Sequence, residues 1–428
     1  MHANRQLHGI AEVMARYRAG RVSRRRALGL LTGLGLTATG AAALIGRGGG
    51  EASAGSAGGH AGHARLGHHQ EAAGTPGAEA PPATPVLGER PDGTRVWRVQ
   101  VAAFSEPDMA EAMAFFPEEI TVAAGDSIFF DNQGFHTVTF LSGAPVPPLA
   151  VPTTAPGTPA AAPAAGAPAV LINPAVAFPL GGDTYDGTSY VNSGLPLDPS
   201  APPFVLTFTT PGSYDYLCLV HPKVMKGKVT VQEAGTAPAV DQTAIDQQIA
   251  EQSAAILGQA ADLVARYDSA TPAAGANGPS VYDVAVGVGE GQLEIFRFVP
   301  DTLTVKTGDT VRWTYRGIQD PHTVTFLGGT EPPEDLIVVP QDAGPPVFGI
   351  NAATFLPAGE AVYHGQGYAN SGYLWPDDPV DERLAGLGMT PPHTYELTFD
   401  TAGDQPYYCI IHGDPIAREG MVATITVA

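Results

Sequence analysis

The sequence YLCLVH at Tyr216–His221 occurs a second time, as YYCIIH at Tyr407–His412, and these two stretches contain both cysteines of the 428-residue chain. In each stretch, aromatic and aliphatic residues surround the cysteine, which is typical of a buried β-strand. A histidine follows the cysteine at the third position. Each stretch therefore predicts a strand that ends next to two potential metal ligands.

The sequence around these stretches is also duplicated, with a period of 186 residues between His136 and His322. Such a period is too long for a solenoid repeat and indicates a duplicated domain. Val, Ile, Thr and aromatic residues alternate with polar ones, and Gly-Asp and Pro-Gly pairs separate them, which predicts short antiparallel strands in a sandwich or barrel. The matching segments are 120–126 with 303–309, 136–140 with 322–326, 187–194 with 365–372, and 216–221 with 407–412.

We therefore expect an all-β protein with two domains and a linker. A stretch near 145–168, almost entirely Ala, Pro, Gly and Thr, predicts an irregular surface excursion from the first domain. Apolar residues spaced by seven predict an amphipathic helix within 240–268, packed on one of the domains. The expected boundaries are 1–54 for a signal or anchor, 55–92 for a disordered tether, 93–233 for domain 1, 234–278 for the helical linker and 279–428 for domain 2.

The N-terminal segment predicts export. Arg24, Arg25 and Arg26 precede a mildly apolar, uncharged run over 27–45, which resembles a twin-arginine (Tat) signal. The run is also just long enough to span a bilayer, so an uncleaved signal would tether the chain to a membrane. We expect a periplasmic, cell-surface or extracellular protein. A cluster of histidines in the tether is interpreted as incidental, with weak metal capture as the alternative: His60, His63, His68 and His69.

The composition narrows the classes of partner. The chain carries 22 Lys and Arg against 43 Asp and Glu, a formal net charge of −21. A surface of this sign excludes a nucleic-acid partner, because phosphate binding requires a basic surface. It favours a redox protein with a basic docking surface, attracted by long-range electrostatic steering. With 44% hydrophobic residues, the chain has enough apolar material for two cores.

Each repeat offers one thiolate, two imidazoles and one thioether. A disulfide between Cys218 and Cys409 is the alternative, but equivalent positions of tandem domains have no general reason to lie within bonding distance. Two His nitrogens, a Cys sulfur and a weak axial Met form a blue-copper site, whereas zinc rarely takes Met. The predicted cofactor is copper, two per chain. The candidate ligands are His136, Cys218, His221 and Met225 in domain 1, and His322, Cys409, His412 and Met421 in domain 2.

On these motifs, both repeats resemble cupredoxins of the plastocyanin and azurin family. The resemblance implies Greek-key β-sandwich domains with type 1 copper at one end and single-electron transfer as the function. It also implies that His221 and His412, on the Cys–Met loops, act as electron ports. Two features depart from the family. Thr137 and Thr323 stand where Asn is frequent, so only a hydroxyl can brace the copper loop, and the longer Cys–Met loop of domain 2 makes Met421 the least secure ligand.

A carrier is favoured over an enzyme. Multicopper oxidases and copper nitrite reductases resemble the layout but need further histidines, whereas the folded body has only His364 and His393 beyond the candidate ligands. The predicted function is thus an exported blue-copper electron carrier. The alternatives are copper capture or storage, and a copper redox enzyme. The motif Tyr-x-Asn-Ser-Gly occurs in both repeats, at 190–194 and 368–372, and is expected to build the same turn twice.

Overall fold

The computed structural model describes residues 84–153, 167–198, 201–268, 279–339, 347–378, 381–384 and 386–428. The predicted export signal, the histidine cluster and most of the tether lie outside these residues. Within the described ranges, no helix is both long and apolar enough to cross a membrane. Residues 88 and 89, expected to lie in the tether, form strand β1 (Gly88–Glu89), which pairs with β2 (Arg95–Ser105) of the first domain.

The first domain is a β-sandwich, so the predicted all-β fold class is confirmed. Aromatic side chains of the two facing layers meet in its core: the ring centroids of Phe140 and Phe208 are 5.7 Å apart, and those of Phe130 and Tyr216 are 5.5 Å apart. One layer contains β3 (Ala110–Phe116), β2, β5 (Ser127–Asn132), β11 (Val205–Phe208) and β9 (Thr184–Tyr185). The other contains β10 (Val191–Asn192), β6 (Thr139–Phe140), β12 (Gly212–Leu217), β13 (Lys226–Gln232) and β4 (Glu119–Ala123).

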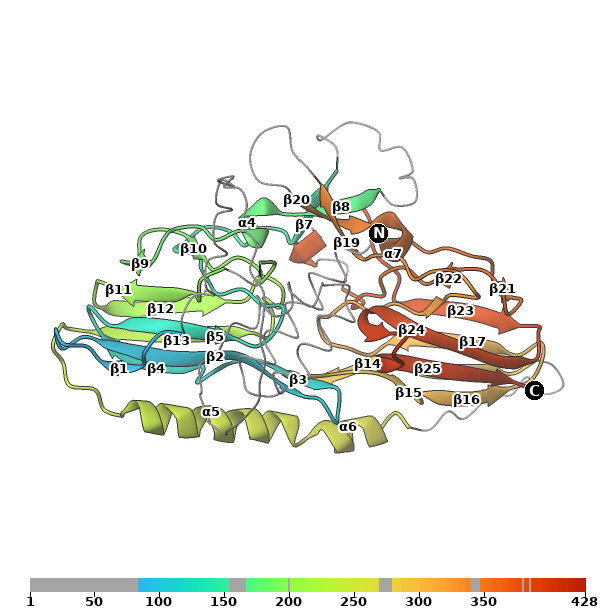
Figure 1. Cartoon of the computed structure of the whole chain (residues 1–428), viewed down its shortest axis with the longest axis horizontal. Helices are drawn as coiled ribbons and strands as arrows, with labels where there is room; N and C mark the ends of the chain where they lie inside the picture. The colour runs from blue at the N-terminus through green and yellow to red at the C-terminus, as the bar shows by residue number, and fades with distance from the viewer. Residues whose placement is uncertain are drawn as a thin grey trace, which may run out of the picture.

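The second domain repeats this arrangement strand for strand (Figure 1). Trp313 and Phe326 form the corresponding contact across its core, with ring centroids 5.8 Å apart. One layer contains β15 (Leu293–Val299), β14 (Val281–Glu290), β17 (Thr310–Tyr315), β23 (Thr394–Phe399) and β21 (Val362–Tyr363). The other contains β16 (Thr302–Val305), β25 (Glu419–Val427), β24 (Gly403–Asp414), β18 (Thr325–Phe326) and β22 (Ala369–Asn370).

The two domains share a continuous sheet. Strands β3 and β15 pair antiparallel, with Glu111 opposite Glu294, and this pairing merges one layer of each domain into an 11-stranded sheet. Both strands are edge strands of their own domains, and pairing satisfies their backbone N–H and C=O groups. The domain joint is therefore built from backbone hydrogen bonds as well as side-chain contacts, and side chains near it are positioned by both domains.

The insertions form a second joint. The alanine- and proline-rich stretch near 145–168 is not irregular at its two ends, where β7 (Ala150–Pro152) pairs with β8 (Pro168–Ile172). Strand β8 also pairs with β20 (Val347–Asn351) of the second domain, and β20 in turn pairs with β19 (Leu336–Val339). The physical reason is burial: Ala150 and Val170 pack in one apolar cluster with Phe355 and Trp375 of domain 2. These packing partners lie in domain 2, so the sequence of the insertion alone could not predict the strands at its ends.

The linker contains two helices, α5 (Gln242–Leu257) and α6 (Ala260–Ala265), where a single helix was expected. The Asp241 side chain caps α5 by accepting a hydrogen bond from the Ala244 N–H. Ile245 and Ile249 pack into the core of domain 1, whereas Leu263 joins a cluster with Val288 of domain 2. The linker thus packs on both domains and runs beneath the shared sheet (Figure 1), not on one domain as predicted.

The repeated Tyr-x-Asn-Ser-Gly motif has the same structural role in both domains. The Asn192 side chain is buried and donates to the carbonyl groups of Ala175, Val176 and Phe178, while its oxygen accepts from Thr139. These carbonyls belong to α4 (Pro174–Ala177) and its C-terminal end, and Asn370 binds α7 (Ala352–Phe355) likewise. The motif ends in a glycine with positive φ, as a tight turn requires, and it anchors a short helix to the strand that follows His136 or His322.

Candidate metal centres

Six of the eight predicted ligand residues come together in two separate groups of three. In domain 1, Cys218 Sγ lies 3.8 Å from Nδ1 of both His136 and His221, and the two nitrogens are 3.0 Å apart. In domain 2, Cys409 Sγ lies 4.0 Å from His322 Nδ1 and 3.6 Å from His412 Nδ1, with 3.1 Å between the nitrogens. Metal–ligand bonds of about 2.0–2.3 Å place ligand atoms roughly 3–4 Å apart, so each group has the dimensions of a metal site.

Both cysteines are buried and free, which excludes the disulfide alternative in this structure. The sequence places each cysteine at the end of one strand and each methionine at the start of the last strand. Domain 1 has this pattern: β12 ends just before Cys218, Met225 directly precedes β13, and the Cys218 N–H donates to the Met225 carbonyl at 3.0 Å. In domain 2, the pattern is wrong, because Cys409 lies within β24 and Met421 within β25. The longer loop there continues as a β-hairpin, in which Gly413 pairs with Gly420.

The methionines are fully buried at these hairpins. Their place as axial ligands stays a prediction.

The cysteine sulfur atoms accept backbone hydrogen bonds. The Thr137 N–H points to Cys218 Sγ at 3.4 Å, and the Thr323 N–H points to Cys409 Sγ at 3.3 Å. Each threonine hydroxyl also accepts a 2.8 Å hydrogen bond from the backbone N–H that follows the cysteine. The hydroxyl groups therefore brace the loops as predicted. These bonds fix the strand of the first histidine against the strand of the cysteine.

Within each group, the cysteine and the histidines shift one another's pKa values. Burial raises the pKa of the Cys218 thiol, but hydrogen bonds from His136 and His221 outweigh it and hold that pKa well below its usual value. Burial alone would lower the pKa of His136, but the charge of Glu111 and the thiolate raise it to about 9. In domain 2, the pKa of His322 rises to about 10 for the same reasons. These shifts favour the charged forms of the cysteine and of the histidines that face it.

Three carboxylates hold the outer nitrogens of the histidine rings, and sequence reasoning missed all three. Glu111 Oε1 lies 2.8 Å from His136 Nε2, and Glu294 Oε1 lies 3.1 Å from His322 Nε2. These two glutamates are the cross-strand partners of the β3–β15 pairing. A carboxylate at Nε2 holds Nδ1 toward the metal side. The sequence held one signal for these two glutamates, which is that they occupy equivalent positions of the two repeats.

The third carboxylate crosses the domain joint. Asp320 Oδ1, from domain 2, lies 2.9 Å from Nε2 of His221 in domain 1. His221 is only 1% exposed. The second domain therefore covers the ring, so His221 does not lie under a free surface patch as the family resemblance implies, and its role as an electron port stays a prediction. His412, in contrast, is partly exposed, and its ring stacks on Phe296 with centroids 4.3 Å apart and planes inclined by 4°.

The two remaining histidines of the folded body lie outside both groups. His364 is exposed and pairs with Asp400, and His393 Nδ1 lies 3.1 Å from the Trp375 carbonyl. Within the described ranges, they join no third group of potential ligands.

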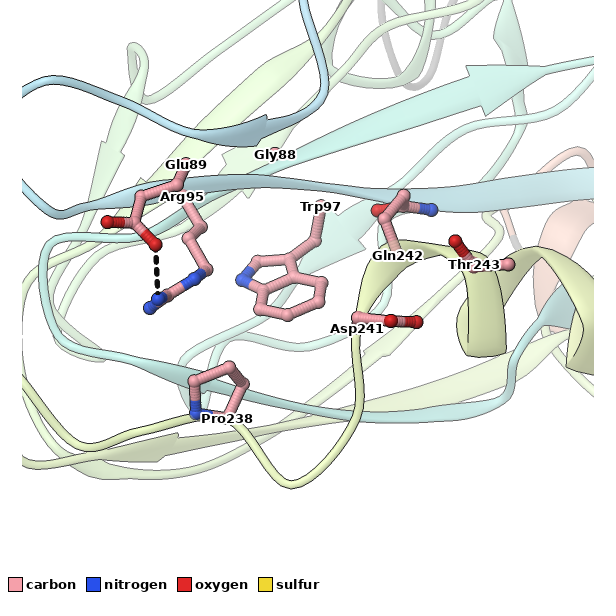
Figure 2. Close-up of a pocket in the computed structure, with 8 residues that line it drawn as sticks. All are labelled: Gly88, Glu89, Arg95, Trp97, Pro238, Asp241, Gln242 and Thr243. Carbon is pink, nitrogen blue, oxygen red and sulfur yellow. Dashed lines mark hydrogen bonds and ion pairs between the residues drawn. The ribbon is translucent and has the colours of Figure 1, made fainter.

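A surface hollow is found at the far end of β2 from the metal centres. Trp97 lies near the start of β2, whereas Phe104, near its end, pairs with Glu111. The hollow is lined by Trp97, the Arg95–Glu89 ion pair and the first residues of α5 (Figure 2). It is separate from the candidate metal chemistry.

No protein-family model matches the chain, and no curated protein matches it. Among solved structures, the chain is similar to a mutant plastocyanin of fern, at 23% identity and a TM-score of 0.18, covering 34% of this chain and 99% of the plastocyanin. It is also similar to a mutant amicyanin in its Cu(I) form, at 18% identity and a TM-score of 0.18, covering 37% of this chain and 94% of the amicyanin. Likenesses of this size carry no argument about function, which is therefore inferred from the geometry of the two groups.

Proposed function

We propose that this protein carries single electrons through two type 1 copper sites, one per domain. The observation that supports the proposal is the duplicated, buried group of one cysteine sulfur and two histidine Nδ1 atoms. A soft thiolate suits Cu(I), and imidazole suits both oxidation states. Bound copper would supply the one-electron change, and Met225 and Met421 would be its weak axial ligands.

The contribution of the chain itself is a rigid donor set. A threonine hydroxyl braces the backbone next to each cysteine, and a carboxylate holds the outer ring nitrogen of each histidine except His412. Side chains held in this way move little when the charge of a bound ion changes, which favours rapid electron transfer. His412 is the ligand we propose as the port, because its ring is partly exposed and is backed by the Phe296 ring.

The remaining parts of the proposal concern the surroundings of the protein. The net charge of −21 supports a redox partner with a basic docking surface. The twin-arginine motif supports export and function outside the cytoplasm. A carrier is proposed in preference to an enzyme because His364 and His393 lie in local contacts and not in a third group of ligands among the described residues.

The test is copper content and visible absorption of the copper-loaded full chain, compared with Cys218→Ser and Cys409→Ser. We expect two coppers in the wild type and an intense blue band that each substitution reduces by about half, since serine cannot supply the thiolate charge-transfer band. Copper-loaded wild type without blue absorption would overturn the carrier proposal and favour copper capture. A third, non-blue copper signal would favour an enzyme.

A further inference from the structure

The contact between His221 of domain 1 and Asp320 of domain 2 has no counterpart in which domain 1 supplies the carboxylate. Asp320 stands two residues before His322, and the equivalent residue of domain 1, two before His136, is Gly134. A Cβ at Gly134 would lie 2.8 Å from His136 Nε2 and 2.8 Å from Glu111 Oε1, so that position leaves no room for a side chain. Domain 2 therefore supplies a carboxylate to the metal centre of domain 1, and domain 1 returns none from the matching place.

A buried arginine holds both sides of this contact. Arg383, which is 1% exposed, donates to the carbonyl of Val220 at 3.1 Å and to the carbonyl of Gln319 at 2.5 Å. Val220 directly precedes His221, and Gln319 directly precedes Asp320. One guanidinium thus fixes the backbone next to each partner of the contact between the domains.

Arg383 is itself held firmly. Its guanidinium pairs with Asp381 at 2.6 Å and lies 4.4 Å from the centroid of the Trp375 ring. The Gln319 side chain adds a further link across the joint by accepting a 3.1 Å hydrogen bond from the Lys223 N–H. The loop that carries His221 is therefore fixed against domain 2 on both sides of the ligand.

We propose that the metal centre of domain 1 is completed by domain 2, with Asp320 as the positioning residue of His221 and Arg383 as the group that holds them together. The inference rests on the proposed function in one respect, that a metal ion occupies the His136, Cys218 and His221 group. A carboxylate on the outer nitrogen fixes the tautomer and orientation of the ring, and loss of such a partner typically weakens metal binding by about 10- to 100-fold.

The domain 2 centre does not depend in the same way on a side chain of the other domain. Its loop histidine, His412, packs its ring against Phe296 of its own domain. Among the described residues, the side-chain hydrogen bonds of His412 are those of its Nδ1, to His322 and Cys409. The two centres, although duplicated in sequence, are therefore expected to differ in their response to the same substitution, and each centre serves as the control for the other.

The test uses the full chain with one centre removed at a time. In the Cys409→Ser background, only the domain 1 centre remains, and Asp320→Asn, Asp320→Glu and Asp320→Ala are compared there by Cu²⁺ titration against a competing chelator. Asparagine matches aspartate in shape but is neutral. We expect binding about 10- to 100-fold weaker for Asp320→Asn, with a shifted charge-transfer band and altered Cu²⁺ hyperfine splitting, and partial rescue by Asp320→Glu.

Asp320→Asn in the Cys218→Ser background is the matched control. Asp320 acts on His412 and His322 of the domain 2 centre through its charge, without a hydrogen bond to either ring, so we expect a much smaller loss of affinity there than at the domain 1 centre. Arg383→Lys, which keeps the charge but loses the fork, is expected to weaken only the domain 1 centre. Unchanged affinity and spectrum at domain 1 in Asp320→Asn would overturn the inference alone. Equal losses at both centres would overturn it in favour of a general structural role. Failure of the Cys409→Ser parent itself to bind copper would overturn the proposed function, and this inference with it.

Discussion

Replacing Gly287 with alanine is expected to disable the metal centre of domain 2 and to leave that of domain 1 intact. Gly287 lies at a β-bulge in β14 with a φ of 62°. A Cβ there would fall 2.6 Å from His322 Cδ2 and closer still to Nε2, whereas real Cβ contacts essentially never fall below 3.0 Å. The imidazole would have to move away from Glu294 and from the other two ligands.

The loss of unfolding free energy in Gly287→Ala follows from the backbone conformation and the packing at this position. An alanine in the left-handed region costs about 1–2 kcal/mol, and overpacking a tight core site costs typically about 1–3 kcal/mol. The unfolding free energy should therefore fall by about 2–5 kcal/mol. The matched residue of domain 1 is Ala102, which occupies the equivalent bulge of β2 with a φ of 63° and is fully buried. The backbone conformation thus accepts a methyl group there, and the His322 ring is what excludes it at Gly287.

The assay is copper titration combined with denaturant unfolding of Gly287→Ala, with Ala102→Gly as the control. We expect one copper per chain in Gly287→Ala, with the signal of the Cys218 centre unchanged, and two coppers in Ala102→Gly. Two fully occupied centres in Gly287→Ala, together with an unfolding free energy within about 0.5 kcal/mol of the wild type, would refute the reasoning.

Three further substitutions test other parts of the structure. Asn192→Ala leaves three carbonyl groups without their side-chain donor, so the free energy of unfolding should fall by about 3 kcal/mol. The control is Tyr190→Phe, which removes one hydrogen bond to the same helix. Arg383→Met leaves the buried Asp381 without its ionic partner, although Asp381 keeps its hydrogen bond from Trp375 Nε1, so we expect a loss of about 3 kcal/mol at pH 7. Burial raises the pKa of Asp381, but Arg383 lowers it by more. The stabilisation by this ion pair is therefore fully present above the unfolded pKa near 3.9 and is lost as pH falls through the lower folded pKa. The unfolding free energies of the wild type and Arg383→Met should converge in acid, and an equal difference at pH 7 and pH 3 would contradict the assignment. Phe296→Leu removes the stacked ring from His412, for an expected loss of about 1 kcal/mol and a changed spectrum at the domain 2 centre alone, whereas a change at the domain 1 centre would contradict it.

The candidate ligands were predictable because their spacing is local or repeated. Cys218 and His221 lie three residues apart at the end of one strand, so the strand and its turn bring them together in any packing of the domain. His136 was found because His322 occupies the same place in the second repeat. The linker helix was predicted from its apolar spacing, but its break near Gly258 was not, because the seven-residue spacing of apolar residues continues across the break.

The sequence by itself determined the all-β class, the duplication and the two donor sets, because alternation and motif spacing act over a few residues. The tertiary structure alone decided that the two centres differ. His221 and Asp320 are 99 residues apart, and Val220 and Arg383 are 163 apart. Those contacts exist because β3 pairs with β15 and β8 with β20. Residue patterns specify which face of a strand is buried, whereas the choice of partner for an exposed strand edge depends on the packing of the whole molecule.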